Sequence, residues 1–413
     1  MLNTEKTRPL SVTALLLTFV FFGISENIKG PALPYIQADY GINELQVGYL
    51  LSINALGFLL ACMLANLLIQ KIEVKAVLLI ALIVMTLAGL LIFGSARYGQ
   101  FSASYFVMYF GNGLLEIVLS IIAARMFQQN TVFMMGLCHF SFGMGSTLGP
   151  LGAAQLIGWP VGGEAMTWQG MYAIMLGLGI VPILLVAISS FPKQIRHEAV
   201  ARLSFREHLR DPILWLLAGI ITFSVIVELS IAGWLVNLME KAYGWSSGSA
   251  AGLLAAFFFV FMISRLALSP LIERMGYAKS MMLFSALCGL CCIAGAALGS
   301  SFFVLFVLAG LGVAPLYPTV MACVTKLYPG NTDGAVNFII VVWAIGSMGG
   351  NVAVGGLTTA FKDWASAWLG QERGQVLGLE LGFMFIGLLA LIGAYMSWML
   401  LRKMRSMETV RSY

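Results

Sequence analysis

The sequence predicts an all-α membrane protein with twelve transmembrane helices in two six-helix pseudo-symmetric halves. Of its 413 residues 60% are hydrophobic and only 10% are charged, with a mean hydropathy of +0.92, whereas a soluble domain carries about 25% charged residues. Apolar runs of about 20 residues, long enough to cross a bilayer as a helix, recur along the whole chain. The two halves also repeat each other. No separate soluble domain is expected.

Twelve apolar stretches are expected to span the membrane. They are residues 10–36, 45–70, 74–96, 99–126, 131–158, 168–191, 212–239, 246–271, 278–299, 301–327, 332–361 and 376–402. The longest polar interruption, 192–211, is predicted to link an N-terminal bundle, 1–191, to a C-terminal bundle, 212–413. The first apolar run is too long for a cleavable signal peptide and lacks a small-residue cleavage site.

The positions of the cations predict the orientation of the spans. With both termini on the inside, eighteen lysines and arginines fall in inner segments, while only Arg97, Lys241, Lys362 and Arg373 fall outside. Cations concentrate on the cytoplasmic side of membrane proteins, so both termini are expected in the cytoplasm and the protein in the inner membrane. Because these cations sit in loops, the net charge of +5 does not indicate a nucleic-acid partner.

The halves of the chain carry similar segments about 200 residues apart, which is typical of a duplicated unit. The matched pairs are Leu68–Ile72 with Leu271–Met275, Gly111–Gly113 with Gly310–Gly312, and Glu26 with Glu228. Two parallel six-helix repeats joined by a cytoplasmic loop are typical of the major facilitator architecture. In that architecture the substrate is expected between the halves near the midplane, exposed to each side in turn.

Two acids of the N-terminal half are candidates for proton coupling. Glu116 lies in the fourth span, where a charge costs roughly 2.5–3.5 kcal/mol on insertion scales, and no cation stands three or four residues away. The alternative is a neutral glutamic acid that holds helices together. Glu26 and Lys29 are three residues apart on one helix face, so they either neutralise each other or form a switch. Because Gly30, Pro31 and Pro34 follow, this end of the first span is expected to be bent or unwound.

The seventh span carries the best candidates for substrate binding. Glu228 and Asn237 offer a carboxylate and an amide to sugar hydroxyls, and Trp234 offers an indole face to sugar C–H groups; the alternative is an interhelical hydrogen bond and an interfacial tryptophan. His139 is the only histidine within a span and either binds substrate or is a satisfied core residue. Further candidates for the cavity wall are Asn54, Asn112, Tyr317, Trp343 and Asn351.

Arg265, near the cytoplasmic end of the eighth span, is expected to gate the transporter. It would bond the inner loops in the outward-facing state together with Glu273 and Arg274, while Lys29 would gate the first span. The sequence shows no phosphate loop, metal-ligand spacing or nucleophile–base pair. We therefore expect no cofactor, no metal, no enzymatic activity and no ATP-driven transport.

Four stretches resemble the fucose-permease-like sugar transporters of the major facilitator superfamily, a group that includes relatives of sodium-dependent glucose transporters. They are Ala65–Ala76, a degenerate form of the usual Gly-x-x-x-Asp-Arg loop; Gly113–Glu116; His139–Gly145 with Gly149-Pro150; and Val227–Trp234. The chain departs from the group in its first span, where Ser25-Glu26-Asn27 stands in place of an Asn-Asp pair.

These patterns predict a secondary active transporter that acts as a monomer in the lipid bilayer. A monosaccharide is the expected substrate and protons are the expected coupling ion, with sodium as the alternative. An exporter of drugs or amphipathic metabolites by proton antiport is the other transport function considered. A sensor and a membrane enzyme are disfavoured, because an appended domain and a catalytic constellation are not found in the sequence.

Overall fold

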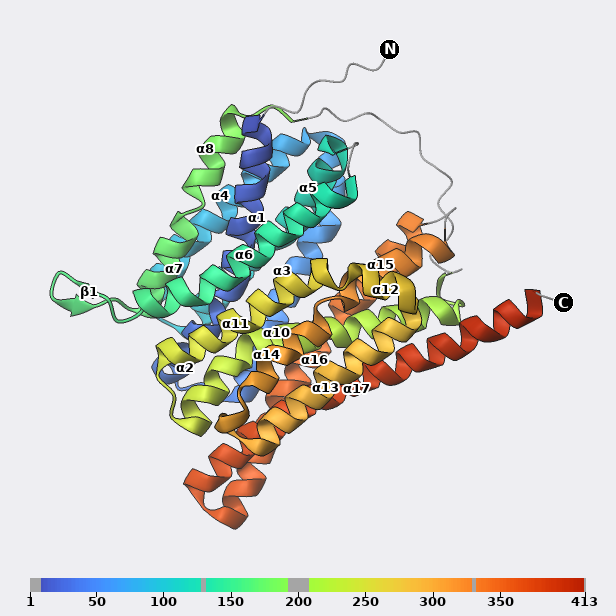
Figure 1. Ribbon diagram of the computed structural model, residues 1–413. Coiled ribbons are helices and arrows are strands. Elements are labelled where there is room, and N and C mark those ends of the chain that lie inside the picture. The colour runs from blue at the N-terminus through green and yellow to red at the C-terminus, as the bar shows by residue number, and fades with distance from the viewer. Residues whose placement is uncertain (1–8, 128–130, 192–207, 329–331, 412–413) are drawn as a thin grey trace. The chain divides into compact units, whose positions relative to one another are not determined.

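The computed structural model describes residues 9–127, 131–191, 208–328 and 332–411, and these residues are almost entirely helical (Figure 1). The elements of the first half are α1 (Pro9–Asn27), α2 (Lys29–Tyr40), α3 (Glu44–Lys71), α4 (Val74–Phe93), α5 (Tyr98–Met126), α6 (Thr131–Leu156), β1 (Pro160–Val161), β2 (Glu164–Ala165), α7 (Trp168–Gly177) and α8 (Ile180–Ile188). Those of the second half are α10 (Pro212–Tyr243), α11 (Ser247–Ala267), α12 (Ser269–Met275), α13 (Tyr277–Leu298), the 3-10 turn Ser300–Phe302, α14 (Val304–Val313), α15 (Leu316–Leu327), α16 (Thr332–Leu369) and α17 (Gln371–Arg411).

Eleven helices within the described residues are long and apolar enough to cross a membrane. Three of them combine two neighbouring elements: α1 with α2, α7 with α8, and α14 with α15. The helix α6, with 26 residues, has the length of a further span. The predicted all-α membrane fold of twelve helices is confirmed.

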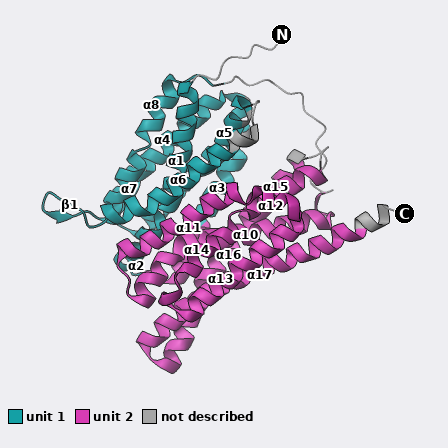
Figure 2. Ribbon diagram, in the orientation of Figure 1, with its two compact units in different colours: residues 1–41, 53–196 teal, residues 42–52, 197–413 magenta. Residues whose placement is uncertain are grey.

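The chain forms two compact units (Figure 2). Unit 1 comprises residues 1–41 and 53–196, and unit 2 comprises residues 42–52 and 197–413. The helix α3 therefore begins in unit 2 and continues in unit 1. Most of the predicted linker, together with four of its five cations, lies outside the described residues.

Local chemistry accounts for the ends of several helices. Asp211 caps α10, because its Oδ1 accepts hydrogen bonds from the backbone N–H groups of Ile213 (2.8 Å) and Leu214 (3.3 Å), and Pro212 takes the first helical position. Gly244 ends α10 at a left-handed φ of 68°. The first span is not unwound after Glu26: only Ile28 interrupts it, and its N–H still donates to Ile24 O at 3.1 Å.

Glycines allow the helices of unit 1 to pack closely. A Cβ on Gly23 of α1 would overlap the carbonyl oxygen of Phe142, and one on Gly145 of α6 would overlap that of Val20. The two backbones approach each other at both points, which only glycine permits, as small residues commonly do between membrane helices. This contact fixes α1, and with it Glu26, against α6.

The two Gly-x-Gly segments of the sequence repeat serve the same purpose in their own units. Gly111 approaches Met85 of α4 while Gly113 approaches α3, and Gly310 approaches α11 while Gly312 approaches α13. Each segment thus contacts the second and third spans of its half, but in opposite order. Because Gly310 and Gly113 each contact the second span of their half, Gly310 corresponds to Gly113 rather than to Gly111.

Candidate functional site

A polar stripe runs along α5 in unit 1. Tyr105, Tyr109, Asn112 and Glu116 are separated by four, three and four residues, a spacing that places side chains on one face of a helix. At 1.5 Å per residue the stripe is about 16 Å long. Two of its members, Asn112 and Glu116, are predicted site residues, whereas the tyrosines were not predicted.

The carboxylate of Glu26, which lies on α1, contacts the middle of this stripe. Glu26 Oε1 accepts a hydrogen bond from Asn112 Nδ2 at 2.9 Å, and Glu26 Oε2 lies 3.6 Å from Lys29 Nζ. Lys29 Nζ in turn donates to the hydroxyl of Tyr109 at 2.9 Å. Only 12% of the Glu26 side chain and 4% of the Lys29 side chain are exposed. We call these four residues the Glu26 cluster; the structure thus confirms that Glu26 and Lys29 face each other.

Further hydrogen bonds fix the parts of the Glu26 cluster. The Ser25 hydroxyl donates to Asn112 Oδ1 at 2.9 Å, which orients the amide so that its nitrogen faces Glu26. The Asn27 amide donates to Ser146 Oγ of α6 at 2.9 Å. Since all four side chains that these bonds join are buried, the bonds form away from competing water and hold α1, α5 and α6 in one arrangement.

Two more tyrosines extend the polar stripe beyond Tyr109. The rings of Tyr105 and Tyr109 meet edge to face with centroids 5.2 Å apart, and the Tyr172 hydroxyl of α7 donates to that of Tyr105 at 3.4 Å. All three side chains are buried. The spacing of Tyr105 and Tyr109 from Asn112 is the signal in the sequence that identifies them, because polar atoms that recur on one face of an apolar helix require partners.

Electrostatics explains why Glu26 and Lys29 occur together. An isolated charge in the apolar interior is strongly disfavoured. At 3.6 Å and an effective dielectric constant of 20, opposite charges attract by roughly 4–5 kcal/mol. The amide of Asn112 and the hydroxyl of Tyr109 add hydrogen bonds to the two charged groups. Glu26 and Lys29 therefore compensate each other's charge. Loss of either charge would leave the other buried and unpaired, which is disfavoured.

Glu116 lies one turn after Asn112 and is more accessible than Glu26. Its side chain is half-buried, and it lies close enough to Cys62 of α3 for an electrostatic interaction. At about 100° per residue, Glu116 projects between the direction of Asn112, which meets α1, and that of Gly113, which meets α3. Asn112 therefore lies between two carboxylates on one side of α5. The carboxylate of Glu26 is buried and paired with Lys29, whereas that of Glu116 is partly exposed.

Asn54 of α3 is a buried amide with no protein partner. Only 3% of the residue is exposed, and neither Oδ1 nor Nδ2 has a hydrogen-bond partner among the described residues. It lies one turn before Gly57 and Phe58, which contact α5, so it projects from the same side of α3. Unsatisfied buried amides are rare in proteins, and this one is available to water or a solute.

His139 does not join the Glu26 cluster. Its side chain is exposed on α6, with its ring 6.4 Å from that of Phe19 of α1. Both the role of His139 in substrate binding and the alternative of a satisfied core residue stay predictions.

In unit 2, the predicted residues of α10 do not lie together. Trp234 and Asn237 share one face with Ser230, and all three are buried. The nine residues from Glu228 to Asn237 correspond to about two and a half turns, so Glu228 lies on the opposite side, where it is half-buried and interacts with Cys288 of α13. The combination of Glu228 with Trp234 and Asn237 is therefore corrected to two separate faces.

The face of α10 with Trp234 and Asn237 is the one that packs on α16 and α17. Along that face Gly219 contacts Met396 of α17, and Gly350 of α16 contacts Ile226. The indole Nε1 of Trp234 and the hydroxyl of Ser230 are buried and have no hydrogen-bond partner within the described residues. Ser230, which was not predicted, thus joins Trp234 as a polar group available to water or a solute.

The remaining predicted binding residues of unit 2 occupy α15 and α16. Asn351 is buried, and its Nδ2 donates to the carbonyl of Leu51 in the first turns of α3 at 3.3 Å. Tyr317 of α15 and Trp343 of α16 are half-buried.

The predicted gating arginine contacts the end of α14 and a ring of its own helix. Arg265 Nε of α11 donates to the carbonyl of Ala314 after α14 at 3.2 Å, and its guanidinium lies 4.3 Å from the centre of the Phe261 ring. Glu273 and Arg274 are exposed on α12, and neither forms a salt bridge with a described residue. A gating role for these three residues stays a prediction.

A second buried ion pair holds the first turns of α3 on α16 in unit 2. Glu44 Oε1 lies 2.8 Å from Lys362 Nζ, and both side chains are largely buried. The N–H of Leu45 donates to Thr359 Oγ1 at 3.0 Å, and the Ser52 hydroxyl donates to Met348 O at 2.6 Å. We call these contacts the α3–α16 clasp. Because its partners are about 300 residues apart, no local pattern in the sequence indicated it.

Comparison with known proteins identifies the fold. Residues 15–350 and 228–411 match the Major Facilitator Superfamily. A bacterial homologue of the human lysosomal transporter Spinster has a similar structure, with a TM-score of 0.80 and 14% identity over 96% of this chain and 98% of that one. The Escherichia coli fucose:proton symporter gives a TM-score of 0.61 and 19% identity over 93% and 98%. A D-xylose–proton symporter gives 0.75 and 11% over 94% and 97%.

The helical fold and the family match together define a multi-pass membrane transporter, and not an enzyme. The chain belongs to the Major Facilitator Superfamily.

Proposed function

We propose that the protein is a proton-coupled secondary transporter that moves a small polar solute, a monosaccharide, across the inner membrane, with both termini in the cytoplasm. The observation that carries this proposal is the Glu26 cluster. It joins a buried, lysine-paired carboxylate through Asn112 to the turn of α5 that bears the more accessible Glu116.

The two carboxylates differ in what protonation would do to their surroundings. Protonating Glu26 removes the charge that compensates buried Lys29, which is strongly disfavoured unless Lys29 gains another anion. Glu116 is half-buried, so water reaches it more readily than Glu26. In the proposed mechanism Glu116 takes up and releases the proton. The Glu26–Lys29 pair acts as the switch, which Asn112 connects to Glu116.

A hydroxyl-rich solute suits the polar groups that lack protein partners. In unit 1 the amide of Asn54 offers both a donor and an acceptor, and in unit 2 Trp234 offers a donor and Ser230 a hydroxyl. Neutral donors and acceptors of this kind recognise sugars, whereas an amphipathic drug would require a larger apolar surface. Among the structural neighbours, the fucose and xylose proteins are both described as proton symporters.

Purified protein in liposomes that contain a pH-sensitive dye tests the proposal. A panel of monosaccharides is added with and without sodium, and we expect a sugar-dependent entry of protons that does not need sodium. A pH change only with sodium would overturn proton coupling. Silence across the panel from folded protein, with proton-driven extrusion of amphipathic compounds, would favour the exporter instead.

Substitution of Glu116 tests its role separately. The variant Glu116→Gln should abolish accumulation against a gradient and spare exchange of substrate between the two sides. Glu380→Gln is the matched control, since Glu380 is also a half-buried acid within a span but lies on α17 of unit 2. Normal accumulation by Glu116→Gln would contradict its assignment as the proton carrier.

A further inference from the structure

Unit 2 carries a groove between α10, α16 and α17. Its volume is about 540 Å³. The lining residues are Pro212, Trp215, Leu216, Gly219, Thr222, Phe223, Val342, Gly346, Met396, Met399 and Lys403. No residue proposed for substrate binding or proton coupling lines it.

The wall of this groove is apolar except for one charge. The two uncharged side chains with nitrogen or oxygen atoms in the wall are already satisfied: Thr222 donates to Ala218 O at 2.7 Å, and Trp215 Nε1 donates to Leu209 O at 3.0 Å. Lys403 is the one charged residue of the lining and is half-buried. A sugar would find few hydrogen-bond partners here. An apolar chain with a negatively charged end would find an apolar wall for the chain and a cation for the charge.

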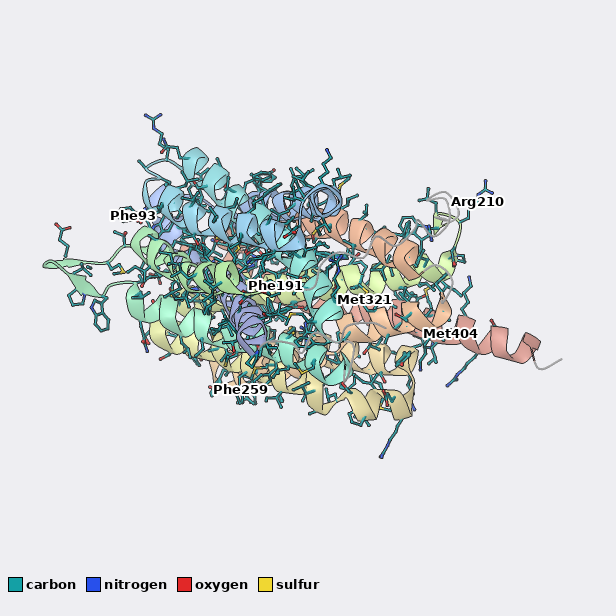
Figure 3. All side chains as sticks on the ribbon, turned by 90° about the horizontal axis from the view of Figure 1, so that it is seen from above. Phe93, Phe191, Arg210, Phe259, Met321 and Met404 are labelled. Atoms are coloured by element: carbon teal, nitrogen blue, oxygen red, sulfur yellow. The ribbon has the colours of Figure 1, made fainter. Side chains whose placement is uncertain are left out.

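The length and position of the groove fit one leaflet of a bilayer. Along α10 its lining runs from Pro212 to Phe223, about 16 Å at 1.5 Å per residue, and half of the roughly 30 Å hydrocarbon core is about 15 Å. The groove begins at the start of α10, beside Lys403 of α17, and Arg210 and Met404 lie at this same end of unit 2 (Figure 3). The apolar wall therefore extends from the level of the headgroups toward the middle of the bilayer.

Charge at the open end favours an anion. Besides Lys403, the exposed residues Arg210, just before α10, and Arg405, near the end of α17, lie at the same end of unit 2. The nearby acid, Asp211, is occupied by the Tyr328 hydroxyl at 2.5 Å and by backbone N–H groups of α10. A phosphate group would thus meet several cations at this end.

We propose that this groove binds an anionic phospholipid, with one acyl chain along α10 and the headgroup phosphate at Lys403. Basic residues between transmembrane helices at the membrane surface are a known means of holding such headgroups, and each contributes about fivefold in affinity. Three features support this assignment: the polar groups of the wall are satisfied, the wall is as long as one leaflet is thick, and a single lysine lies at the headgroup level.

The experiment compares lipids on the intact, delipidated protein by native mass spectrometry. Phosphatidylglycerol and phosphatidylethanolamine with identical acyl chains are offered, and we expect phosphatidylglycerol to bind at least fivefold more tightly. Lys403→Ala should remove most of this preference and Lys403→Arg should retain it. Arg402→Ala is the matched control: it removes the same charge one residue away, from a side chain that stacks on Trp398 at 4.5 Å and does not line the groove.

A second variant tests the acyl chain. Leu216→Trp fills the groove and should weaken both lipids, whereas Leu290→Trp, at a side chain of α13 that is 59% exposed, should not. The proposal is overturned by equal binding of the two lipids, by equal losses from Lys403→Ala and Arg402→Ala, or by equally tight binding of soluble glycerol phosphate. Dimers that exclude the lipid would likewise overturn it, because a second copy would then cover the groove.

Discussion

The proposal that Glu26 and Lys29 compensate each other's charge can be tested through the free energy of unfolding. At 3.6 Å its charges attract by roughly 4–5 kcal/mol at an effective dielectric constant of 20, and loss of one partner of a buried pair typically costs about 3–5 kcal/mol. We expect Lys29→Met and Glu26→Gln each to lower the free energy of unfolding by about that amount. The double variant should lose far less than the sum, because it leaves no charge uncompensated.

Unfolding in mixed micelles measures this double-mutant cycle. Lys279→Met serves as the control, since Lys279 is exposed at the start of α13 and its loss should change the free energy of unfolding by at most about 0.5 kcal/mol. Single-variant effects that add up in the double variant would refute the coupling. If the pair is also the switch, the folded double variant should exchange substrate but fail to accumulate it.

Three further predictions concern other contacts. Asn54→Leu removes an unsatisfied amide, and an amide of this kind costs about 1–3 kcal/mol when it is buried. We therefore expect the melting temperature of the variant to rise and its KM for substrate to increase. A fall in both the melting temperature and the KM would contradict this. Lys362→Ala should destabilise by about 3–5 kcal/mol because buried Glu44 loses its partner, and the charge-swapped double variant should regain much of the lost melting temperature. Gly145→Ala forces a Cβ into the α1 backbone and should cost about 1–3 kcal/mol, whereas Gly252→Ala, at an open helix position, should not destabilise.

Hydrophobicity and helix periodicity determine much of what could be predicted from the sequence. Long apolar runs locate the spans, and the spacing of Glu26 and Lys29 places them on one helix face. Hydropathy does not find the helix ends: α16 and α17 run to Leu369 and Arg411, past the predicted 361 and 402, because polar turns continue the helices beyond the apolar core.

The rest of the candidate site depends on contacts between segments far apart in the sequence. Asn112 bonds Glu26 across 86 residues, and the α3–α16 clasp joins residues about 300 apart; a single sequence holds no local signal for such pairs. Helix geometry alone separates Glu228 from Asn237, since nine residues along a helix lead to its opposite side. Residues that are close in sequence on a helix need not be close in space.

The small hairpin between α6 and α7 offers a practical handle. Its strands β1 and β2 are exposed, and they are joined by Gly162 and Gly163, whose φ angles are 62° and 93°. Exposed turns of this kind accept inserted sequence readily. An epitope placed between the two glycines would let antibodies on intact cells report which side of the membrane this hairpin faces, and a bound antibody fragment would serve as a fiducial for electron microscopy.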